Sequence, residues 1–395
     1  MPTPTKLNSR LGTYVLKTFK DESFRAYVPP QLPPDPPLAL QPLLPLLEQA
    51  NQGLGRLDGL ASILPDLSLF IYLYIRKEAV LSSQIEGIQL SFSDLMLFES
   101  VETPSVPLED VQDVSNYVAA MNHGLRRLRE DFPLSLRLIR ETHKILLSKG
   151  RGSGKRPGGF RETQNWIGGT RPGNAAFVPP PPEKLMECVA ALEKFLHRQQ
   201  EDLPLLVKTA LVHVQFETVH PFLDGNGRLG RLLITFLLFV AGAIREPILY
   251  LSLYFKTNRR RYYELLDRVR THGDWETWLE FFLIGVNESA QQAADTSREI
   301  LTLIEKDRQK IEELGRPAGS VLHVHKHLQR KPIITIPTTA EQLSLSAPTV
   351  AKALQHMVKL GMVRETTGKQ RHRLFAYHRY LDILNQGTEL PKASH

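Results

Sequence analysis

The sequence predicts a mainly α-helical protein with one β-hairpin near its middle and a C-terminal winged helix-turn-helix of the α+β type. Apolar residues recur at helical spacing over most of the chain beyond residue 43. Glycines and prolines at 163–182 separate two short apolar pairs, a pattern typical of a hairpin. Between residues 339 and 377, two short helical segments joined by a tight turn precede a basic hairpin, which is the order of a winged helix.

The length and composition indicate a globular protein of several parts. Its 395 residues, 42% of them hydrophobic and 23% charged, are enough for two or three domains with a large core. We expect an N-terminal helical segment at 1–105, a central domain at 106–293, a connecting helix at 294–315 and the winged helix at 316–385.

Composition also limits the compartment and the partners. The single cysteine, Cys188, excludes an internal disulfide and fits a reducing environment, so we expect a cytoplasmic protein. The longest nearly apolar run, 232–244, is too short to span a bilayer, and we expect no membrane association. The net charge of +7 suits a nucleotide or nucleic-acid partner.

The N-terminal part is expected to be an irregular arm followed by helices. Six prolines within 29–37 disfavour a helix and favour an extended arm over residues 1–45. A strong helix is predicted at Leu67–Gln84. The sequence Ser82-Ser-Gln-Ile-Glu86-Gly87 begins in the last turn of this helix and extends just past its end. Gly87 is a C-cap signal. Because Glu86 opposes the helix dipole at this end, its charge is expected to have a partner elsewhere in the fold.

The middle of the chain is predicted to hold four amphipathic or buried helices, at 107–131, 135–149, 182–200 and 203–219. His143 on the second of them is interpreted as structural. The basic segment 149–161 resembles half of a P-loop but lacks its first glycine and the hydroxyl residue after the lysine. We therefore interpret it as a flexible basic loop near a substrate entrance.

The stretch from His220 to Arg231, HPFLDGNGRLGR, precedes an apolar run that reads as a buried helix. The backbone N–H groups of Gly225, Asn226 and Gly227 should therefore lie where a helix begins. There they are unpaired and at the positive end of the helix dipole, which favours an anion such as phosphate.

Charged side chains in the same stretch complete a polyphosphate site. Arg228 and Arg231, three residues apart, can reach further phosphates. Asp224 offers hard oxygen ligands for a phosphate-bound Mg²⁺, and His220 can accept a proton near neutral pH. Each of these residues alone has an ordinary structural explanation, but their combination within twelve positions favours function.

Every fixed position of this stretch matches the signature of the Fic family, His-x-Phe-x-(Asp/Glu)-Gly-Asn-Gly-Arg-x-x-Arg, which it resembles. The resemblance implies a Fic-type helical core and a protein adenylyltransferase that moves AMP from ATP onto Ser, Thr or Tyr hydroxyls of target proteins or of itself. His220 would be the base and Asp224 would hold Mg²⁺. The backbone of Gly225–Gly227 would cradle the phosphates, while Arg228 and Arg231 would position the β- and γ-phosphates.

The family resemblance extends upstream of the signature. Ser82-x-x-x-Glu86-Gly87 is similar to an inhibitory motif in which the glutamate pairs with the second signature arginine, here Arg231. The pair would keep Arg231 from the γ-phosphate and so inhibit transfer. The same resemblance allows Glu86 to orient a water that removes AMP from targets.

Further roles follow from the resemblance. The hairpin at 163–182 would be a flap over the site, with Ile167 and Phe177 as clamp residues for the target; an ordinary surface hairpin is the alternative. Asn258 and Tyr263 would lie around the adenine. We also expect a homodimer.

The winged helix has two interpretations. Lys352 on its second helix and Lys369, Arg371 and Arg373 on its wing are candidate contacts to DNA phosphates. A protein-interaction module that keeps the fold is the alternative. His323 and His327 have helical spacing for a metal, but no further ligand lies nearby in the sequence, so a solvated helix face is the better interpretation.

Three rival functions remain open. Phosphorylation or phosphocholine transfer occurs in relatives, although the intact Gly-Asn-Gly-Arg favours AMP transfer. A hydrolase that removes AMP would use the same residues. A DNA-binding regulator would depend on residues 316–380 alone.

Overall fold

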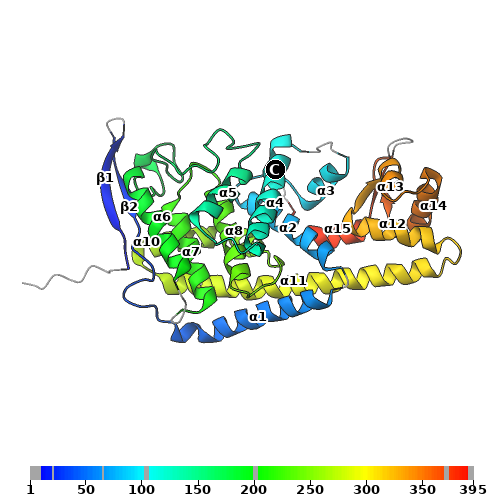
Figure 1. Cartoon of the computed structure of the whole chain (residues 1–395), viewed down its shortest axis with the longest axis horizontal. Coiled ribbons are helices and arrows are strands. Elements are labelled where there is room, and N and C mark those ends of the chain that lie inside the picture. Colours follow the sequence, from blue (N-terminus) through cyan, green and yellow to red (C-terminus); the bar gives the residue numbers. More distant parts are fainter. Residues whose placement is uncertain are drawn as a thin grey trace, which may run out of the picture.

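The computed structural model describes residues 10–19, 22–64, 66–101, 106–198, 203–368 and 373–389. Helices make up most of this part of the chain, as the sequence predicts (Figure 1). The central helices pack into one body, and the last helices and short strands lie beyond it at the far end of a long helix (Figure 1).

The N-terminus contains a β-hairpin where the sequence analysis expected irregular chain. Strands β1 (Thr13–Phe19) and β2 (Glu22–Val28) pair antiparallel over their whole length. β2 packs Phe24 and Ala26 against Val178, so one face is anchored to the body. The expected irregular arm over residues 1–45 is therefore wrong for residues 13–28.

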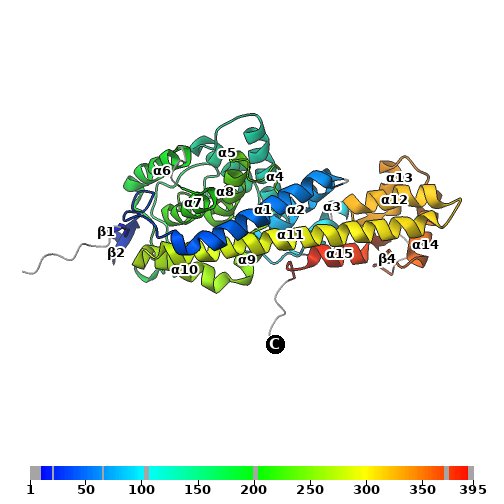
Figure 2. The same ribbon diagram turned by 90° about the horizontal axis from the view of Figure 1, so that it is seen from below.

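Two long helices run along one side of the molecule, α1 (Leu44–Ile63) and α11 (Trp275–Glu312), and they lie against each other (Figure 2). α11 begins within the predicted central domain at Trp275 and continues through most of the predicted connecting helix at 294–315 without a break. The apolar stripe continues through the junction, because Ala290, Ala293, Ala294 and Ile300 are all buried.

The remaining helices of the body surround a buried pair, α7 and α8, which contact each other closely. α7 and α8 are buried over almost all of their lengths, and they carry polar residues such as His213, Glu217 and Arg231 into the interior. The helices of the body are α2 (Leu67–Ile85), α3 (Phe92–Val101), α4 (Leu108–Arg129), α5 (Leu136–Leu146), α6 (Pro182–His197), α7 (Leu205–Val219), α8 (Asn226–Val240), α9 (Ser252–Thr257) and α10 (Arg259–His272).

The C-terminal part has four helices in the described residues and a small antiparallel sheet of strand order β3-β5-β4. This arrangement is compatible with the predicted winged helix. The N-cap of its helix α14 is Ser346, whose hydroxyl accepts from the Thr349 N–H at 3.2 Å. The elements are α12 (Ala318–Arg330), β3 (Ile333–Thr335), α13 (Ile336–Gln342), α14 (Ala347–Lys359), β4 (Arg364–Glu365), β5 (Leu374–Ala376) and α15 (His378–Asn385).

None of the helices in the described ranges is both long and apolar enough to cross a membrane.

Candidate active site

The loop between α7 and α8 holds the predicted signature. His220 ends α7 in the left-handed backbone conformation (φ 48°, ψ 61°), and Gly225 precedes α8 in the same conformation (φ 76°). Asn226 fixes the loop from within. Its side-chain amide donates to the Phe222 carbonyl at 2.8 Å, and its side-chain oxygen accepts from the Phe222 N–H at 2.9 Å. The side chain of Asn226 is thus committed to the loop, which leaves its backbone for a ligand.

Phe222 is fully buried under the loop. Its ring stacks on His143 with centroids 3.7 Å apart. His143 contacts the carbonyl of Asp224 through Nε2 at 2.9 Å and accepts from the Gly158 N–H at Nδ1. Burial lowers the pKa of His143 to about 4, so the ring is neutral at physiological pH. His143 is therefore structural, as predicted, and it supports the loop from below.

A cavity of about 290 Å³ lies above this loop. It brings together seven of the residues that the sequence analysis singled out as a site, from two distant parts of the chain. The predicted residues in its wall are Glu86, His220, Asp224, Gly225, Asn226, Gly227 and Arg228. The other residues that line it are Ile88, Asp113, Arg151 and Leu223.

Glycines are needed where the cavity wall is tightest. A Cβ atom on Gly227 would lie 2.3 Å from the Glu86 Oε1 atom. A Cβ atom on Gly152 would lie 2.7 Å from the Asp224 Oδ2 atom, and Gly152 has a φ of +78°. The backbone of both residues therefore approaches the carboxylates, and a phosphate in the cavity could approach the same backbone closely.

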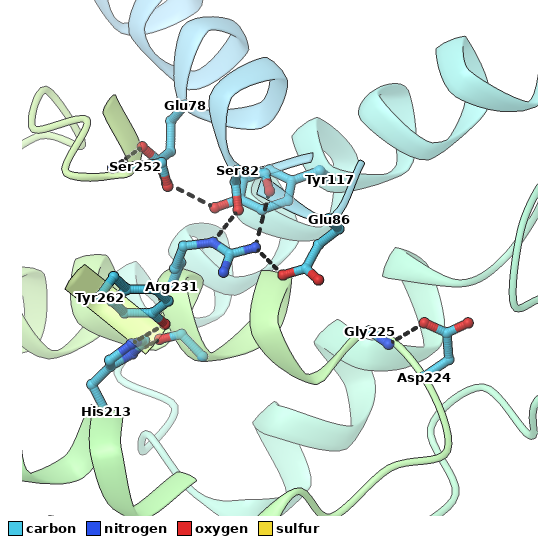
Figure 3. A network of polar contacts seen from close by, with 11 residues as sticks. Glu78, Ser82, Glu86, Tyr117, His213, Asp224, Gly225, Arg231, Ser252 and Tyr262 are labelled. Carbon is cyan, nitrogen blue, oxygen red and sulfur yellow. Dashed lines mark hydrogen bonds and ion pairs between the residues drawn. The ribbon is translucent and has the colours of Figure 1, made fainter. Parts of the chain in front are cut away.

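Arg231 is not among the residues that line the cavity, and its guanidinium is held by the end of α2 (Figure 3). Its Nη2 donates to Glu86 Oε1 at 2.6 Å and to the Ser82 carbonyl at 2.9 Å, while its Nε donates to the Ser82 hydroxyl at 2.8 Å. Burial is the largest influence and raises the pKa of Glu86, but the interactions with Arg231, Arg228 and His220 together outweigh it, and the net pKa is below the ordinary value. The carboxylate is therefore ionised at neutral pH and the ion pair is fully charged.

The end of α2 is shaped to present Glu86. Gly87 has a φ of +91°, its N–H donates to the Gln84 carbonyl at 3.0 Å, and the N–H of Ile88 donates to the Ser83 carbonyl at 3.2 Å. These two bonds form a Schellman motif. The C-cap signal read from Gly87 is confirmed by this geometry.

Arg228 is almost completely buried in the cavity wall. Its Nη1 atom lies 3.9 Å from Asp113 Oδ1, and among the described residues neither its Nε nor its Nη1 has a hydrogen-bond partner. Burial raises the pKa of Asp113 to about 6 against the opposing effect of Arg228. A guanidinium with free donors beside an open cavity is suited to bind an anionic group.

His220 is neutral at physiological pH. Burial, and then the charge of Arg270, lower its pKa to about 4. Its Nδ1 lies 3.4 Å from the Glu217 carbonyl, which can only accept. In the neutral ring that contact places the proton on Nδ1 and leaves the lone pair on Nε2.

The predicted hairpin at 163–182 is reduced to one antiparallel bridge, between Ile167 and Phe177. The two backbone bonds of the bridge are 2.8 and 3.1 Å long. The guanidinium of Arg270 lies 3.9 Å from the centre of the Phe177 ring. The Tyr27 N–H donates to the Val178 carbonyl at 2.9 Å, so β2 adds to the same β-structure.

The two residues predicted to lie around the adenine are both outside the cavity wall. Asn258 donates to the Tyr254 carbonyl at 3.0 Å and lines a separate cavity of about 280 Å³. Tyr263 is 40% exposed and is absent from the phosphate cavity wall. Their assignment to the adenine stays a prediction.

Sequence reasoning missed Asp113 and Arg151. Asp113 lies in the helix predicted at 107–131, and Arg151 lies in the segment 149–161 that was predicted to be a flexible loop; neither residue was assigned to the site. Arg151 donates to Asp110 at 2.5 Å beside the cavity. Asp110 and Asp113 both lie on the buried face of α4. Because carboxylates are rarely buried without a partner, their positions in the predicted helix were the signal that could have pointed to this site.

The carboxylates of the cavity fit a magnesium ion. Asp224 Oδ1 accepts the Gly225 N–H at 2.6 Å, and both oxygens of Asp113 are buried with no hydrogen-bond partner among the described residues. No group of three or more His, Cys, Asp or Glu able to hold a metal occurs in the described ranges. A site with one or two carboxylates suits Mg²⁺, which keeps several waters and binds substrate phosphates.

The other histidine patterns are structural or unsupported. His213 is buried between the Gly230 carbonyl and the Tyr262 hydroxyl, at 3.1 and 2.8 Å. His323 and His327 belong to no metal-binding group in the part of the chain that the structure describes.

Lys352 is exposed on α14, and the guanidinium of Arg373 lies 5.3 Å from the centre of the Phe375 ring. Lys369 and Arg371 lie outside the described residues. A role of these four residues in nucleic-acid binding stays a prediction.

Comparison with known proteins identifies two adjacent regions of one family. A model described as "Fic/DOC family N-terminal" matches residues 44–126, and a model described as "Fic/DOC family" matches residues 133–238. The chain is 32% identical over 202 residues to the Protein adenylyltransferase Fic of Culex quinquefasciatus, covering 50% of this chain and 37% of that protein. It is 34% identical over 154 residues to the protein of the same name from Aedes aegypti, covering 39% and 28%. The match thus spans about a third of the length of these relatives.

Solved structures show the same fold. A Fic family protein from Desulfovibrio desulfuricans is similar with a TM-score of 0.56 at 19% identity, covering 87% of this chain and 97% of the other. A Fic domain-containing signaling protein from Bacteroides thetaiotaomicron gives 0.51 at 19% identity, covering 64% and 97%. Two adjacent stretches of this chain, residues 44–126 and 133–238, thus match the two regions of the Fic/DOC family in order, and the chain shares its fold with these Fic proteins.

Proposed function

We propose that this protein is an adenylyltransferase that moves AMP from ATP onto hydroxyl groups of proteins and that is inhibited by its own Glu86. The observation that carries the proposal is the single cavity at the N-terminal end of α8. It joins a neutral histidine, a helix N-terminus, a carboxylate and a buried arginine with free donors. The names of the similar insect proteins support the same reaction class.

His220 would act as the general base. The hydroxyl oxygen of the target forms a bond to the α-phosphorus of ATP, and its proton passes to the neutral imidazole. The bond from that phosphorus to the bridging oxygen breaks, and pyrophosphate leaves. A base with its lone pair on Nε2 at neutral pH meets the requirement of this step.

The phosphate groups would be bound by the start of α8. The backbone N–H groups of residues 225–227 lie at the positive end of the helix, and Arg228 adds a charged donor. Asp224, with Asp113 beside it, would hold Mg²⁺, which when bound neutralises phosphate charge.

The brake acts through Arg231. While its guanidinium is engaged by Glu86 and Ser82, it cannot also turn fully to a γ-phosphate. The nucleotide then binds without the geometry that transfer requires. Removal of Glu86 frees both the arginine and the space beside Gly227.

Target proteins would dock as an extended segment against the flap at Ile167 and Phe177. The bridge between these residues shows that the flap backbone can form β-type hydrogen bonds. The same proposal includes modification of the protein by itself and a homodimer. Sedimentation of the purified protein measures whether it is a dimer.

Transfer of label from ATP tests the proposal. The wild type, Glu86→Gly and Glu86→Gly with His220→Ala are incubated with Mg²⁺ and a cell lysate, with ATP labelled at the α- or the γ-phosphate. Glu130→Gly, at an exposed glutamate outside the cavity, is the matched control. We expect α-label on protein to rise only with Glu86→Gly and to vanish in the double variant. Protein labelled only from the γ-position would identify a kinase instead.

A second reaction of the same cavity is removal of AMP from modified proteins. It is favoured by the position of Glu86, which lines the cavity together with His220 and retains 36% exposure of its side chain. A carboxylate so placed could orient a water. Release of AMP from protein labelled by Glu86→Gly, on adding the wild type, tests this; no release would count against it.

DNA binding through the C-terminal part is a separate proposal. Lys352 is exposed on α14 at the position of a recognition helix, and Arg373 precedes β5 at the base of the wing. A gel shift with random duplex DNA at low salt tests it, with Lys352→Ala and Arg373→Ala as variants. No shift at low salt would favour the protein-interaction alternative.

A further inference from the structure

Arg161 is the last residue of the segment 149–161, which the sequence analysis interpreted as a flexible basic loop. The structure separates it from that loop. Lys155 and Arg156 are exposed, whereas Arg161 is only 2% exposed. It also lies outside the wall of the phosphate cavity.

The guanidinium of Arg161 is surrounded by backbone carbonyls. Its Nε donates to the His220 carbonyl at 3.0 Å, and its Nη2 donates to the carbonyls of Pro180 at 2.5 Å and Val219 at 3.4 Å. Its Nη1 donates to the Thr163 carbonyl at 3.4 Å. One side chain therefore joins both ends of the flap to the end of α7.

No carboxylate forms a salt bridge with Arg161 among the described residues. Burial lowers the pKa of Arg161 to about 10, so the group is still protonated at neutral pH. A buried cation that is neutralised only by carbonyl dipoles costs folding free energy. We therefore expect the buried guanidinium of Arg161 to have a role in positioning the groups that it contacts.

What it positions is the catalytic histidine. A non-glycine residue with φ of 48° is intrinsically unfavourable, and the last carbonyls of a helix lack partners within the helix. Arg161 supplies partners to two of those carbonyls, at Val219 and at His220 itself. Asn165, on the flap, adds bonds from its side-chain amide to the carbonyls of Phe222 at 3.0 Å and His220 at 3.5 Å.

We propose that Arg161 is a positioning residue that locks the flap and the His220 loop into one unit, so that the histidine and the docked target segment keep a fixed distance. This inference rests on the proposed function for its catalytic consequence. Its structural part, the orientation and environment of the His220 ring, does not depend on the reaction.

The test uses the full-length chain with Arg161→Lys and Arg161→Ala, each alone and with Glu86→Gly. Arg156→Ala is the matched control, because Arg156 is exposed and ion-paired only to Glu162 among the described residues. Ring-labelled histidine NMR follows the His220 titration, with His220→Ala to assign its signal among the 13 histidines. Transfer kinetics give kcat and the KM for ATP, and thermal melting reports folding.

We expect the His220 pKa to rise towards its ordinary value in Arg161→Ala, because a nearby positive charge is lost and water enters. We expect kcat to fall about 10- to 100-fold with little change in KM for ATP, since misplacement of a catalytic group by about 1 Å has effects of this size. Arg161→Lys should recover part of the rate, because one ammonium can serve some of the four carbonyls. Arg156→Ala should leave both readouts unchanged.

An unchanged His220 titration and an unchanged kcat in a folded Arg161 variant would overturn the proposal. So would a loss of rate that follows the melting temperature alone. If Arg161→Ala does not fold, Arg161→Lys and Asn165→Ala decide the question by the same readouts. If no variant transfers label, including Glu86→Gly, the proposed function fails, and the histidine titration still decides whether Arg161 positions His220.

Discussion

Glu86 Oε1 lies 2.6 Å from Arg231 Nη2, although 145 positions separate the two residues in the chain. The arginine side chain is 2% exposed, and the glutamate side chain is 36% exposed towards the cavity. The contact joins the end of α2 to the second turn of α8. The charge of Glu86, which opposes the dipole of its own helix, thereby gains a partner on another helix.

The two anchors of Arg231 should contribute separately to the brake. Glu86→Gln keeps the size of the side chain but removes its charge, and Ser82→Ala removes the hydroxyl that accepts from Nε at 2.8 Å. A charged hydrogen bond contributes about 1.5–3 kcal/mol, so we expect the labelling rate to rise about 10-fold or more with Glu86→Gln and less with Ser82→Ala. Label transfer at saturating ATP measures both. Equal rates in the wild type and both variants would contradict the prediction.

The pH profile of transfer should reflect the low pKa of His220. Burial and Arg270 lower that pKa to about 4, and only the unprotonated ring can act as a base. In the Glu86→Gly background we expect kcat/KM to be flat with respect to His220 from about pH 6 upwards, and to fall below that range with a midpoint near the pKa. Initial rates across buffers of constant ionic strength check it. A midpoint at the ordinary histidine pKa would show that the ring is more hydrated than the structure indicates.

Glu217 should make stability depend on pH. Burial raises its pKa to about 7, and its Oε1 has no hydrogen-bond partner among the described residues. Because the folded pKa is raised, the stabilisation is complete below the unfolded pKa and is lost as pH rises through about 7. Glu217→Gln should therefore match the wild type near pH 4.5 and be more stable at pH 8, by about 2–3 kcal/mol.

Urea unfolding of the wild type and Glu217→Gln at several pH values gives this difference directly. Glu130→Gln, at an exposed site, is the control and should follow the wild type at every pH. Parallel stability curves for all three proteins would show that Glu217 is not protonated in the fold.

The C-terminal segment should help to hold the inhibitory end of α2. The Gln84 amide donates to the Thr388 carbonyl and to the Leu90 carbonyl, both at 2.8 Å, two positions before Glu86. Gln84→Ala removes both bonds, so we expect a lower melting temperature by about 2–4 °C and a higher basal labelling rate. Gln89→Ala is the control, because Gln89 is exposed and, among the described residues, its side-chain amide contacts only the Gly87 carbonyl, at 3.5 Å. If both variants behave alike, the C-terminal segment has no effect on the brake.

Local patterns carried much of the prediction. The body helices predicted at 67–84, 107–131, 135–149, 182–200 and 203–219 follow from apolar spacing, and the loop from His220 to Arg231 follows from its glycines and the apolar run after it. These features depend on interactions within a few residues, so one sequence reveals them. The pairing of Ile167 with Phe177 also follows from local pattern, because a short hairpin joins neighbours in sequence.

The failures share a different cause. The β1–β2 hairpin was missed although its strands are adjacent, because its anchoring contact, Tyr27 to Val178, comes from a segment about 150 positions away. The continuity of α11 depends on the packing of Ala293 and Ala294 in the core, which periodicity alone does not reveal. Arg161 was assigned to a flexible loop because its hydrogen-bond partners are backbone carbonyls. Every residue has a backbone carbonyl, so the sequence does not show which carbonyls will become partners.

The chain alone therefore indicates which chemical groups the site contains, since histidine, aspartate, arginine and a glycine turn are recognisable by type and spacing. Only the tertiary structure decides their state. Burial lowers the pKa of His220, a helix from the N-terminal region brings Glu86 to Arg231, and Arg161 reaches across three segments. Charge, hydration and distance arise from residues that are remote in sequence, and folding is what brings them together.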